Sequence, residues 1–182
     1  MMVIILLALA CFTLLGLMAF AYYGAFASLN IRIEEQGGET VVCRSITGDY
    51  RQSGMIMDKI YYTLLNDYNV ETFKGYAKYF DNPRNVERNK LRSEAGCIVE
   101  PADADRLALA ATDFMTKQLP VDHYIVAEFP YKGKLSVLFG LVKVYPALRR
   151  FADQNGCGDA PVVDIYDIPN KRIFYRKEII VE

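Results

Sequence analysis

The sequence predicts an α+β protein in which an N-terminal transmembrane helix precedes a tandem strand–helix–strand–strand duplication. Residues 1–31 contain no charged side chain, whereas the rest of the chain holds every Asp, Glu, Lys and Arg. Beyond this segment, strand-like alternation and helix-like spacing of apolar residues follow each other in the same order twice. The expected parts are a transmembrane anchor at 1–30, a juxtamembrane spacer at 31–39 and a domain at 40–182, with halves at about 40–100 and 121–182 joined by a linking helix at 102–118.

The uncharged N-terminal segment is long enough to cross a bilayer, because about 20 helical residues span the hydrocarbon core. Tyr22 and Tyr23 lie where an interfacial aromatic belt is expected. The alternative is a cleaved signal peptide, for which Ala25-Phe26-Ala27 offers a small-residue site. The apolar run is longer than a signal peptide core and no basic residue precedes it, so we favour an uncleaved anchor in a lipid bilayer.

Charge around this segment predicts its orientation. Arg32, Arg44 and Arg51 follow the span, whereas only the α-amino group precedes it. The excess of basic residues next to a span faces the cytoplasm. We therefore expect the domain to face the cytosol.

The first half of the domain begins with a β-rich stretch and continues with an amphipathic helix. Apolar residues at three- and four-residue spacing predict the helix over Gly54–Tyr68. Alternating aromatics predict the next strand over Lys74–Asp81, which Asn82-Pro83 ends. The strands expected on either side of these elements are Thr40–Thr47 and Gly96–Glu100.

The second half repeats this order after the linking helix. That helix has Asp103 near its start and Lys117 near its end, as the helix dipole favours, and Pro120 stops it. Within the later helix, Pro146 is expected either to kink the chain or to begin a second short helix. The expected elements are a strand at Tyr124–Tyr131, a helix at Leu135–Ala152 and strands at Val162–Tyr166 and Ile173–Ile179.

Residue identities support the duplication. Phe80-Asp81-Asn82-Pro83 and Tyr166-Asp167-Ile168-Pro169 each place an aromatic at a strand end before an Asp-x-Pro turn, at matching positions of the two halves. The alternative is a chance likeness between two hairpin turns. Two such units form one antiparallel sheet with the helices on one face, and the groove between the halves is the natural ligand site.

Composition argues against several classes of function. The formal net charge of −1 shows no basic field for nucleic acid. Cys43, Cys97 and Cys157 are widely spaced and odd in number, which predicts free thiols, and His123 is the single histidine. No nucleotide-binding or nucleophile motif is present. We therefore expect no metal, no cofactor and no catalytic residue that sequence alone can assign.

One ordered set of residues matches the pattern of a known family. Its members are Asp81, Asn82 and Pro83, then Arg92 and Gly96, then Pro130, Tyr131 and Pro146, and finally Asp164 and Tyr166. Over roughly residues 40–178 this pattern resembles GyrI-like small-molecule-binding domains. With the N-terminal span, the chain is most similar to the membrane-anchored, testis-expressed ER-phagy receptor branch of that family.

The resemblance implies several functions. GyrI-like domains bind hydrophobic cations through an acidic residue and aromatics in the central cleft, and some are similar to hydrolases of small molecules. The animal branch implies anchorage in the endoplasmic reticulum, a cytosolic domain, an AAA-type unfoldase as partner and a role as an adaptor in autophagy. The family's cleft residue is usually Glu, whereas this chain has the shorter Asp164, and the acidic tail that carries the autophagy motif is not found.

The candidate ligand residues are those that the strand alternation and the resemblance place toward the cleft: Asp164, Tyr166, Glu128 and Tyr79. Asp164 and Tyr166 share one face of their strand because they are two residues apart. An outward-facing surface Asp is the alternative. Three functions stay open: a cytosol-facing membrane adaptor or binding module, a hydrolase of small lipophilic molecules, and a structural protein with a filled cleft.

Overall fold

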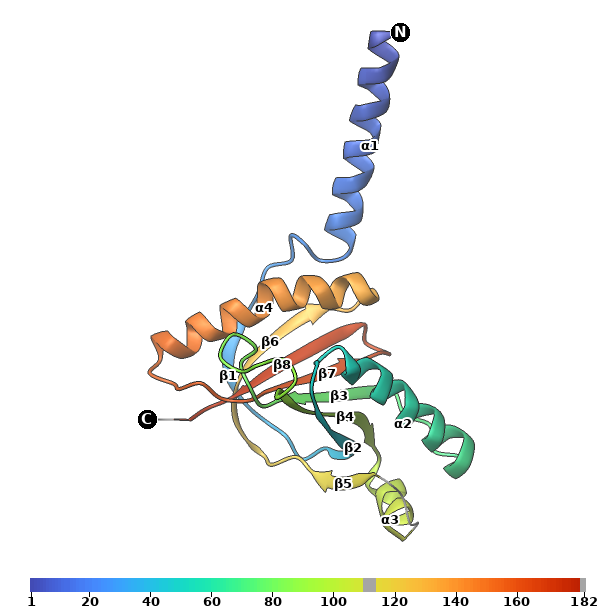
Figure 1. Cartoon of the computed structure of the whole chain (residues 1–182), viewed down its shortest axis with the longest axis vertical. Coiled ribbons are helices and arrows are strands. Elements are labelled where there is room, and N and C mark those ends of the chain that lie inside the picture. Colours follow the sequence, from blue (N-terminus) through green and yellow to red (C-terminus); the bar gives the residue numbers. More distant parts are fainter. Residues whose placement is uncertain (110–113, 181–182) are drawn as a thin grey trace.

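The computed structural model describes residues 1–109 and 114–180 and shows four helices and one eight-stranded antiparallel sheet (Figure 1). The elements are α1 (Met2–Tyr22), β1 (Ile31–Gln36), β2 (Thr40–Thr47), α2 (Gln52–Tyr68), β3 (Lys74–Tyr79), β4 (Arg92–Val99), α3 (Pro101–Leu109), β5 (Met115–Gln118), β6 (Asp122–Pro130), α4 (Lys134–Gln154), β7 (Val162–Asp167) and β8 (Arg172–Glu178).

The order of the strands is symmetric about the middle of the sheet, as a duplication would predict. The sheet runs β1-β6-β8-β7-β3-β4-β2-β5, so the three strands of the first half and the three of the second half mirror each other. The halves meet at the centre, where Lys74–Tyr79 pairs antiparallel with Val162–Asp167. The two strand–helix–strand–strand units therefore form one continuous sheet.

The strand that precedes each half in the sequence forms an edge strand beside the other half. β1 directly precedes β2 but pairs with β6, and β5 directly precedes β6 but pairs with β2. The two short connections cross beside each other, where the Gly38 amide donates to the Leu119 carbonyl at 2.9 Å and the Leu119 amide to the Glu39 carbonyl at 2.8 Å. These bonds bring the two edges of the sheet together, so the sheet is strongly curved.

Glycine makes this closure sterically feasible. Gly37 has φ of +119°, and a Cβ there would lie 1.9 Å from the carbonyl oxygen of Pro120. No other residue type fits both the backbone conformation and the close approach.

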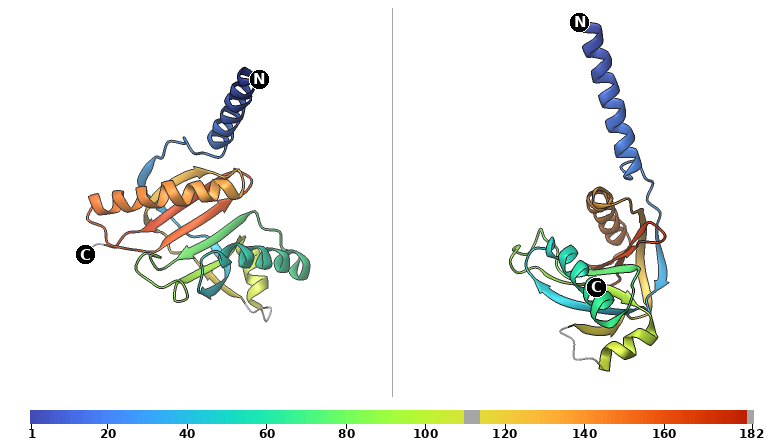
Figure 2. Two further views of the ribbon diagram at one scale, coloured as in Figure 1. Left: turned by 45° about the horizontal axis from the view of Figure 1, so that its top comes forward. Right: turned by 90° about the vertical axis from the view of Figure 1, so that its right-hand side faces the viewer.

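Helices α2 and α4 cover one face of the sheet, as predicted (Figure 2). Ile60 and Leu64 of α2 pack on Val42 and Cys97, and α4 packs on the strands of the second half. The opposite face is enclosed by the curvature, and Val41, Cys43 and Tyr76 on it are fully buried. Both faces of the central strands are therefore core.

Two predicted elements were wrong. Residues 31–39 were expected to be a spacer, but Ile31–Gln36 is strand β1, because its backbone pairs with β6 along its whole length. A linking helix was expected over 102–118. The structure describes helix α3 over Pro101–Leu109, but Met115–Gln118 is strand β5, whose backbone completes the outer edge of β2. Residues 110–113 of that expected helix lie outside the described residues. Pro146 lies inside one helix, α4.

Helix α1 projects from the domain with its side chains exposed (Figure 1). It is the one described helix whose length and apolar composition suffice to cross a membrane, and a signal sequence would satisfy the same criteria. The segment after it contacts the domain. Lys143 of α4 donates to the carbonyls of Ala25 and Ala27 at 2.7 and 2.8 Å, and the rings of Phe20 and Phe139 lie 5.5 Å apart.

Candidate binding site at Asp164

Asp164 lies at the centre of the sheet, on the face that α2 and α4 cover. Its strand, β7, is the strand of the second half that pairs with the first half, and its register partners are Ala77 of β3 and Tyr175 of β8. The side chain is 1% exposed. An acidic group is almost never buried so deeply unless it is paired, so its surroundings decide what it can do.

The Asp164 carboxyl is hydrogen-bonded to a tyrosine and forms no ion pair with a described basic residue. The Tyr145 hydroxyl lies 3.0 Å from Oδ1 and 3.1 Å from Oδ2, and it is the donor when the carboxyl is ionised. Within residues 1–109 and 114–180, no Lys, Arg or His forms an ion pair with Asp164. The site therefore holds an acid without a countercharge.

Tyrosines from six elements or loops surround this acid, and we call them the tyrosine cluster. Ring centroids lie 6.5 Å apart for Tyr79 and Tyr145, 5.7 Å for Tyr145 and Tyr175, and 6.2 Å for Tyr131 and Tyr166. Edge-to-face contacts of this kind stabilise aromatic groups. The cluster consists of Tyr50, Tyr79, Tyr131, Tyr145, Tyr166 and Tyr175.

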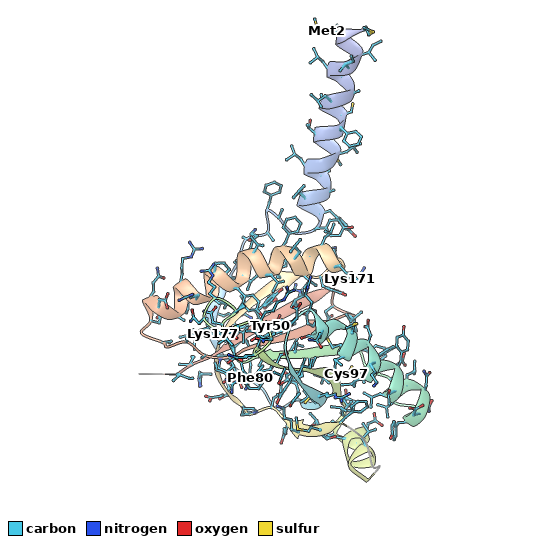
Figure 3. The ribbon with its side chains drawn as sticks, viewed as in Figure 1. Met2, Tyr50, Phe80, Cys97, Lys171 and Lys177 are labelled. Atoms are coloured by element: carbon cyan, nitrogen blue, oxygen red, sulfur yellow. The ribbon has the colours of Figure 1, made fainter. Side chains whose placement is uncertain are left out.

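The cluster extends from the buried acid to the protein surface. Tyr50 precedes α2, packs on Tyr79 at 4.7 Å and is labelled below α4 in Figure 3. Tyr50, Tyr79 and Tyr145 are each partly exposed, whereas Tyr175 is fully buried. The cluster therefore links the buried acid to partly exposed residues.

Burial determines the protonation of the site. It raises the pKa of Asp164 to about 8, although the hydroxyls of Tyr145 and Tyr166 partly oppose the rise. Burial, together with the nearby carboxyl, also raises the pKa of the Tyr79, Tyr145, Tyr166 and Tyr175 hydroxyls. The tyrosines stay neutral at physiological pH, and the carboxyl is mostly protonated near pH 7.

A second polar group beside α4 lacks a partner. The buried Tyr175 hydroxyl forms no hydrogen bond within the described part of the chain. It lies against Gly140, where a Cβ would be 2.0 Å from its oxygen. A buried hydroxyl without a partner is unfavourable for stability.

Three of the four predicted ligand residues lie together. Asp164, Tyr166 and Tyr79 share the helix-covered face of neighbouring strands. Glu128 does not join them: it lies opposite Phe174 on the other face of the sheet, and it forms ion pairs with Arg32 at 2.7 Å and with Arg172. These partners lower the pKa of Glu128, so it is a structural carboxylate.

The residues that carry the family resemblance mostly shape the backbone. Asp81 accepts hydrogen bonds from the Arg92 amide and guanidinium, both at 2.7 Å, which lowers the pKa of Asp81. Asn82 caps the turn through the Arg84 amide at 3.1 Å, and Pro83 lies in that turn.

One further motif position is sterically required, because a Cβ on Gly96 would lie 1.9 Å from the Val42 carbonyl. Pro130 packs beside the segment after α1, where a Cβ on Gly24 would lie 2.9 Å from its ring. Tyr131 is the motif residue that belongs to the tyrosine cluster, whereas Pro146 is exposed on α4.

Tyr50, Tyr145 and Tyr175 are the members of the tyrosine cluster that the sequence analysis missed. Tyr175 lies two residues after Ile173, on the same face of a predicted strand. Tyr145 lies among the inward-facing residues of a predicted helix. Pairing the two strands in register would have placed Tyr175 beside Asp164. The described residues contain no group of three or more His, Cys, Asp or Glu that could hold a metal ion.

Comparisons with solved structures support the fold. The EcmrR chain of an EcmrR–DNA complex has a TM-score of 0.61 and 9% identity, over 93% of this chain and 64% of that one. The EcmrR C-terminal domain has a TM-score of 0.59 and 8% identity, over 85% and 99%. A Listeria innocua hydrolase has a TM-score of 0.50 and 9% identity, over 88% and 98%.

The domain therefore shares its fold with the EcmrR C-terminal domain. Identities this low show the fold alone, and this chain spans less than two thirds of the EcmrR chain. No family model and no curated protein matches the sequence. Nothing in these comparisons supports the ER-phagy branch, so that part of the resemblance stays a prediction.

Proposed function

We propose that this chain is a membrane-anchored binding protein whose GyrI-like domain takes up a small lipophilic cation at Asp164. The observation that carries the proposal is a carboxyl that is 1% exposed, lacks a countercharge and lies within the tyrosine cluster. An organic cation supplies the missing charge, and aromatic rings attract cations through their π faces.

Binding is coupled to the protonation of Asp164. Without a ligand, burial keeps the carboxyl largely neutral near pH 7 because its pKa is raised to about 8. A cation beside it favours the ionised form and lowers this pKa. The proton on Asp164 therefore leaves as the cation binds, and affinity rises with pH up to about 8.

The contacts of the segment after α1 support an uncleaved anchor. Cleavage after Ala27, at the signal-like site, would remove the carbonyls that Lys143 binds and the Phe20–Phe139 contact. These contacts favour an anchor over a signal peptide, because a signal peptide is removed and does not pack on the mature domain. The uncharged helix of 21 residues then holds the binding domain at a bilayer.

The proposal is tested with tetraphenylphosphonium as the cationic probe and triphenylphosphine oxide as a neutral relative. The full chain in lipid nanodiscs is expected to bind the cation more tightly than the neutral compound, by calorimetry. Asp164→Asn should abolish this preference. Asp58→Asn, which removes an exposed carboxylate from α2, should leave it unchanged. Equal binding by both variants would contradict the proposal.

A hydrolase is the second candidate, and the raised pKa of Asp164 favours it. A carboxyl with a pKa near the working pH can both give and accept a proton. Turnover of a lipophilic epoxide such as styrene oxide should then be lost in Asp164→Asn and retained in Asp58→Asn. Absence of turnover by the unmodified chain would leave binding as the function.

The adaptor role at the endoplasmic reticulum, with an AAA-type unfoldase as partner, rests on the resemblance alone. It requires the domain to face the cytosol. Protease treatment of sealed microsomes tests this: digestion of the C-terminal domain without detergent agrees with the adaptor role, and protection until detergent is added excludes it.

A further inference from the structure

The outward side of α4 carries a row of large apolar side chains. Leu135, Leu138 and Val142 are 48%, 54% and 67% exposed. Their spacing of three and four residues places them along one side of the helix. The opposite side of α4 packs in the core through residues such as Val144 and Leu148. Contiguous exposed apolar surface of this kind marks an interaction site.

This row lies beside the end of the N-terminal helix. Phe139, between the exposed residues, contacts Phe20 of α1, and one turn further Lys143 holds the segment after α1. Phe26 in that segment is 69% exposed. Figure 1 shows the first half of α4 lying across the base of α1. A bilayer crossed by α1 therefore meets this side of α4.

Basic side chains border the apolar row. Lys132 and Lys134 precede it, and Arg149 and Arg150 follow it on the same helix, all exposed, whereas Asp153 is the one acidic residue of α4. None of these four cations forms an ion pair within residues 1–109 and 114–180. Apolar residues beside unpaired cations are the pattern of helices that lie in an anionic membrane interface.

We infer that α4 lies in the surface of the bilayer that α1 crosses, with Leu135, Leu138 and Val142 among the acyl chains and the flanking lysines and arginines on anionic headgroups. This inference rests on the anchor in the proposed function. Because Tyr145, which binds Asp164, is on the same helix, the docked domain presents its binding site next to the membrane.

The chain contains no tryptophan, so the fluorescence of one introduced tryptophan reports how deep that residue lies in the bilayer. The full chain carrying Leu138→Trp is reconstituted into vesicles of phosphatidylcholine and phosphatidylglycerol with brominated acyl chains. We expect it to lose most of its fluorescence. Tyr62→Trp, an exposed position on α2, should keep its fluorescence in the same vesicles.

Adding Val142→Glu to Leu138→Trp should restore the fluorescence, because a carboxylate does not enter the acyl region. Flotation of the vesicles in a density gradient shows whether the chain is anchored in them. Equal fluorescence of Leu138→Trp and Tyr62→Trp in chains that float with the vesicles would overturn the docking of α4 and leave the anchor intact.

Failure of the chain to float with the vesicles would overturn the anchor and, with it, the docking of α4. Equal quenching in pure phosphatidylcholine would overturn the role of the anionic headgroups.

Discussion

At the scale of single residues, the buried Asp164 carboxyl lowers the stability of the folded protein without a ligand. Its pKa is about 8 in the folded protein, against about 4 in an unfolded chain. Between these values the folded state holds a proton that the unfolded state has lost, so stability falls as pH rises through this range. Below about pH 4 both states are protonated and the penalty is absent.

Asp164→Asn should therefore stabilise the protein without a ligand. The gain should be small near pH 4 and grow to at most about 5 kcal/mol near pH 8, because each pKa unit corresponds to about 1.4 kcal/mol. Chemical denaturation across this pH range measures it. A gain that does not change with pH would show that the carboxyl is not strained by burial.

Tyr145→Phe should weaken cation binding. It removes the donor to both carboxylate oxygens, so the pKa of Asp164 rises further and the ionised form is harder to reach. A hydrogen bond to a charged group contributes about 1.5–3 kcal/mol, so affinity near pH 7 should fall roughly 10- to 100-fold. Calorimetric titration with tetraphenylphosphonium measures this loss, and Tyr62→Phe on the exposed side of α2 should show none.

Part of the candidate site could be predicted from the sequence. Strand alternation and the resemblance grouped Asp164, Tyr166 and Tyr79, and the structure places these three residues on one face of the sheet. Glu128 was assigned to the wrong face because both faces of the curved sheet are buried, so apolar alternation does not show which face the helices cover. Tyr175 joins the site only through the register of β7 with β8, which the sequence does not encode locally.

At the scale of elements, α4 depends on a glycine to approach the sheet. A Cβ at position 140 would lie 2.0 Å from the hydroxyl and 3.0 Å from Cζ of Tyr175, whose ring is fully buried. Gly140→Ala should destabilise the fold by about 1–3 kcal/mol through overpacking, and it should weaken cation binding by moving Tyr175.

Gly54→Ala in α2 is the matched control, because nothing lies within 4 Å of its added Cβ. That change should stabilise the protein by about 0.5–1 kcal/mol, as Ala is the better helix former. Denaturation of both variants measures the contrast. Stabilisation by both would mean that α4 does not pack on Tyr175 as described.

The long amphipathic helices and central strands were predictable because periodicity fixes them locally. β1 and β5 were not, since each is a short edge strand that exists through its pairing with the other half of the domain. The residues of β5 were read as the end of a helix. Their backbone groups instead complete the edge of β2, and this tertiary pairing overrides local preference.

At the scale of the whole molecule, the crossed connections close the sheet. Gly37→Ala should destabilise the protein strongly, because the backbone conformation and the 1.9 Å approach to the Pro120 carbonyl both oppose a side chain. Gly156→Ala separates the two effects, since Gly156 has positive φ but open space around it. It should cost only about 1–2 kcal/mol.

Thermal unfolding of both variants measures the difference. Equal losses would show that the crossing of the two connections is not closely packed. This closure was not predictable from sequence, because it depends on two segments far apart in the chain that meet only once both halves have formed.

The central claim is that Asp164 changes from neutral to ionised when a cation binds. Calorimetric titration of the full chain with tetraphenylphosphonium near pH 6.5, in buffers of different ionisation enthalpy, counts the protons released. We expect about one proton to be released per cation for the unmodified chain, because the pKa of about 8 keeps Asp164 protonated beforehand, and none for Asp164→Asn. Binding without proton release, or equal release by the variant, would contradict it.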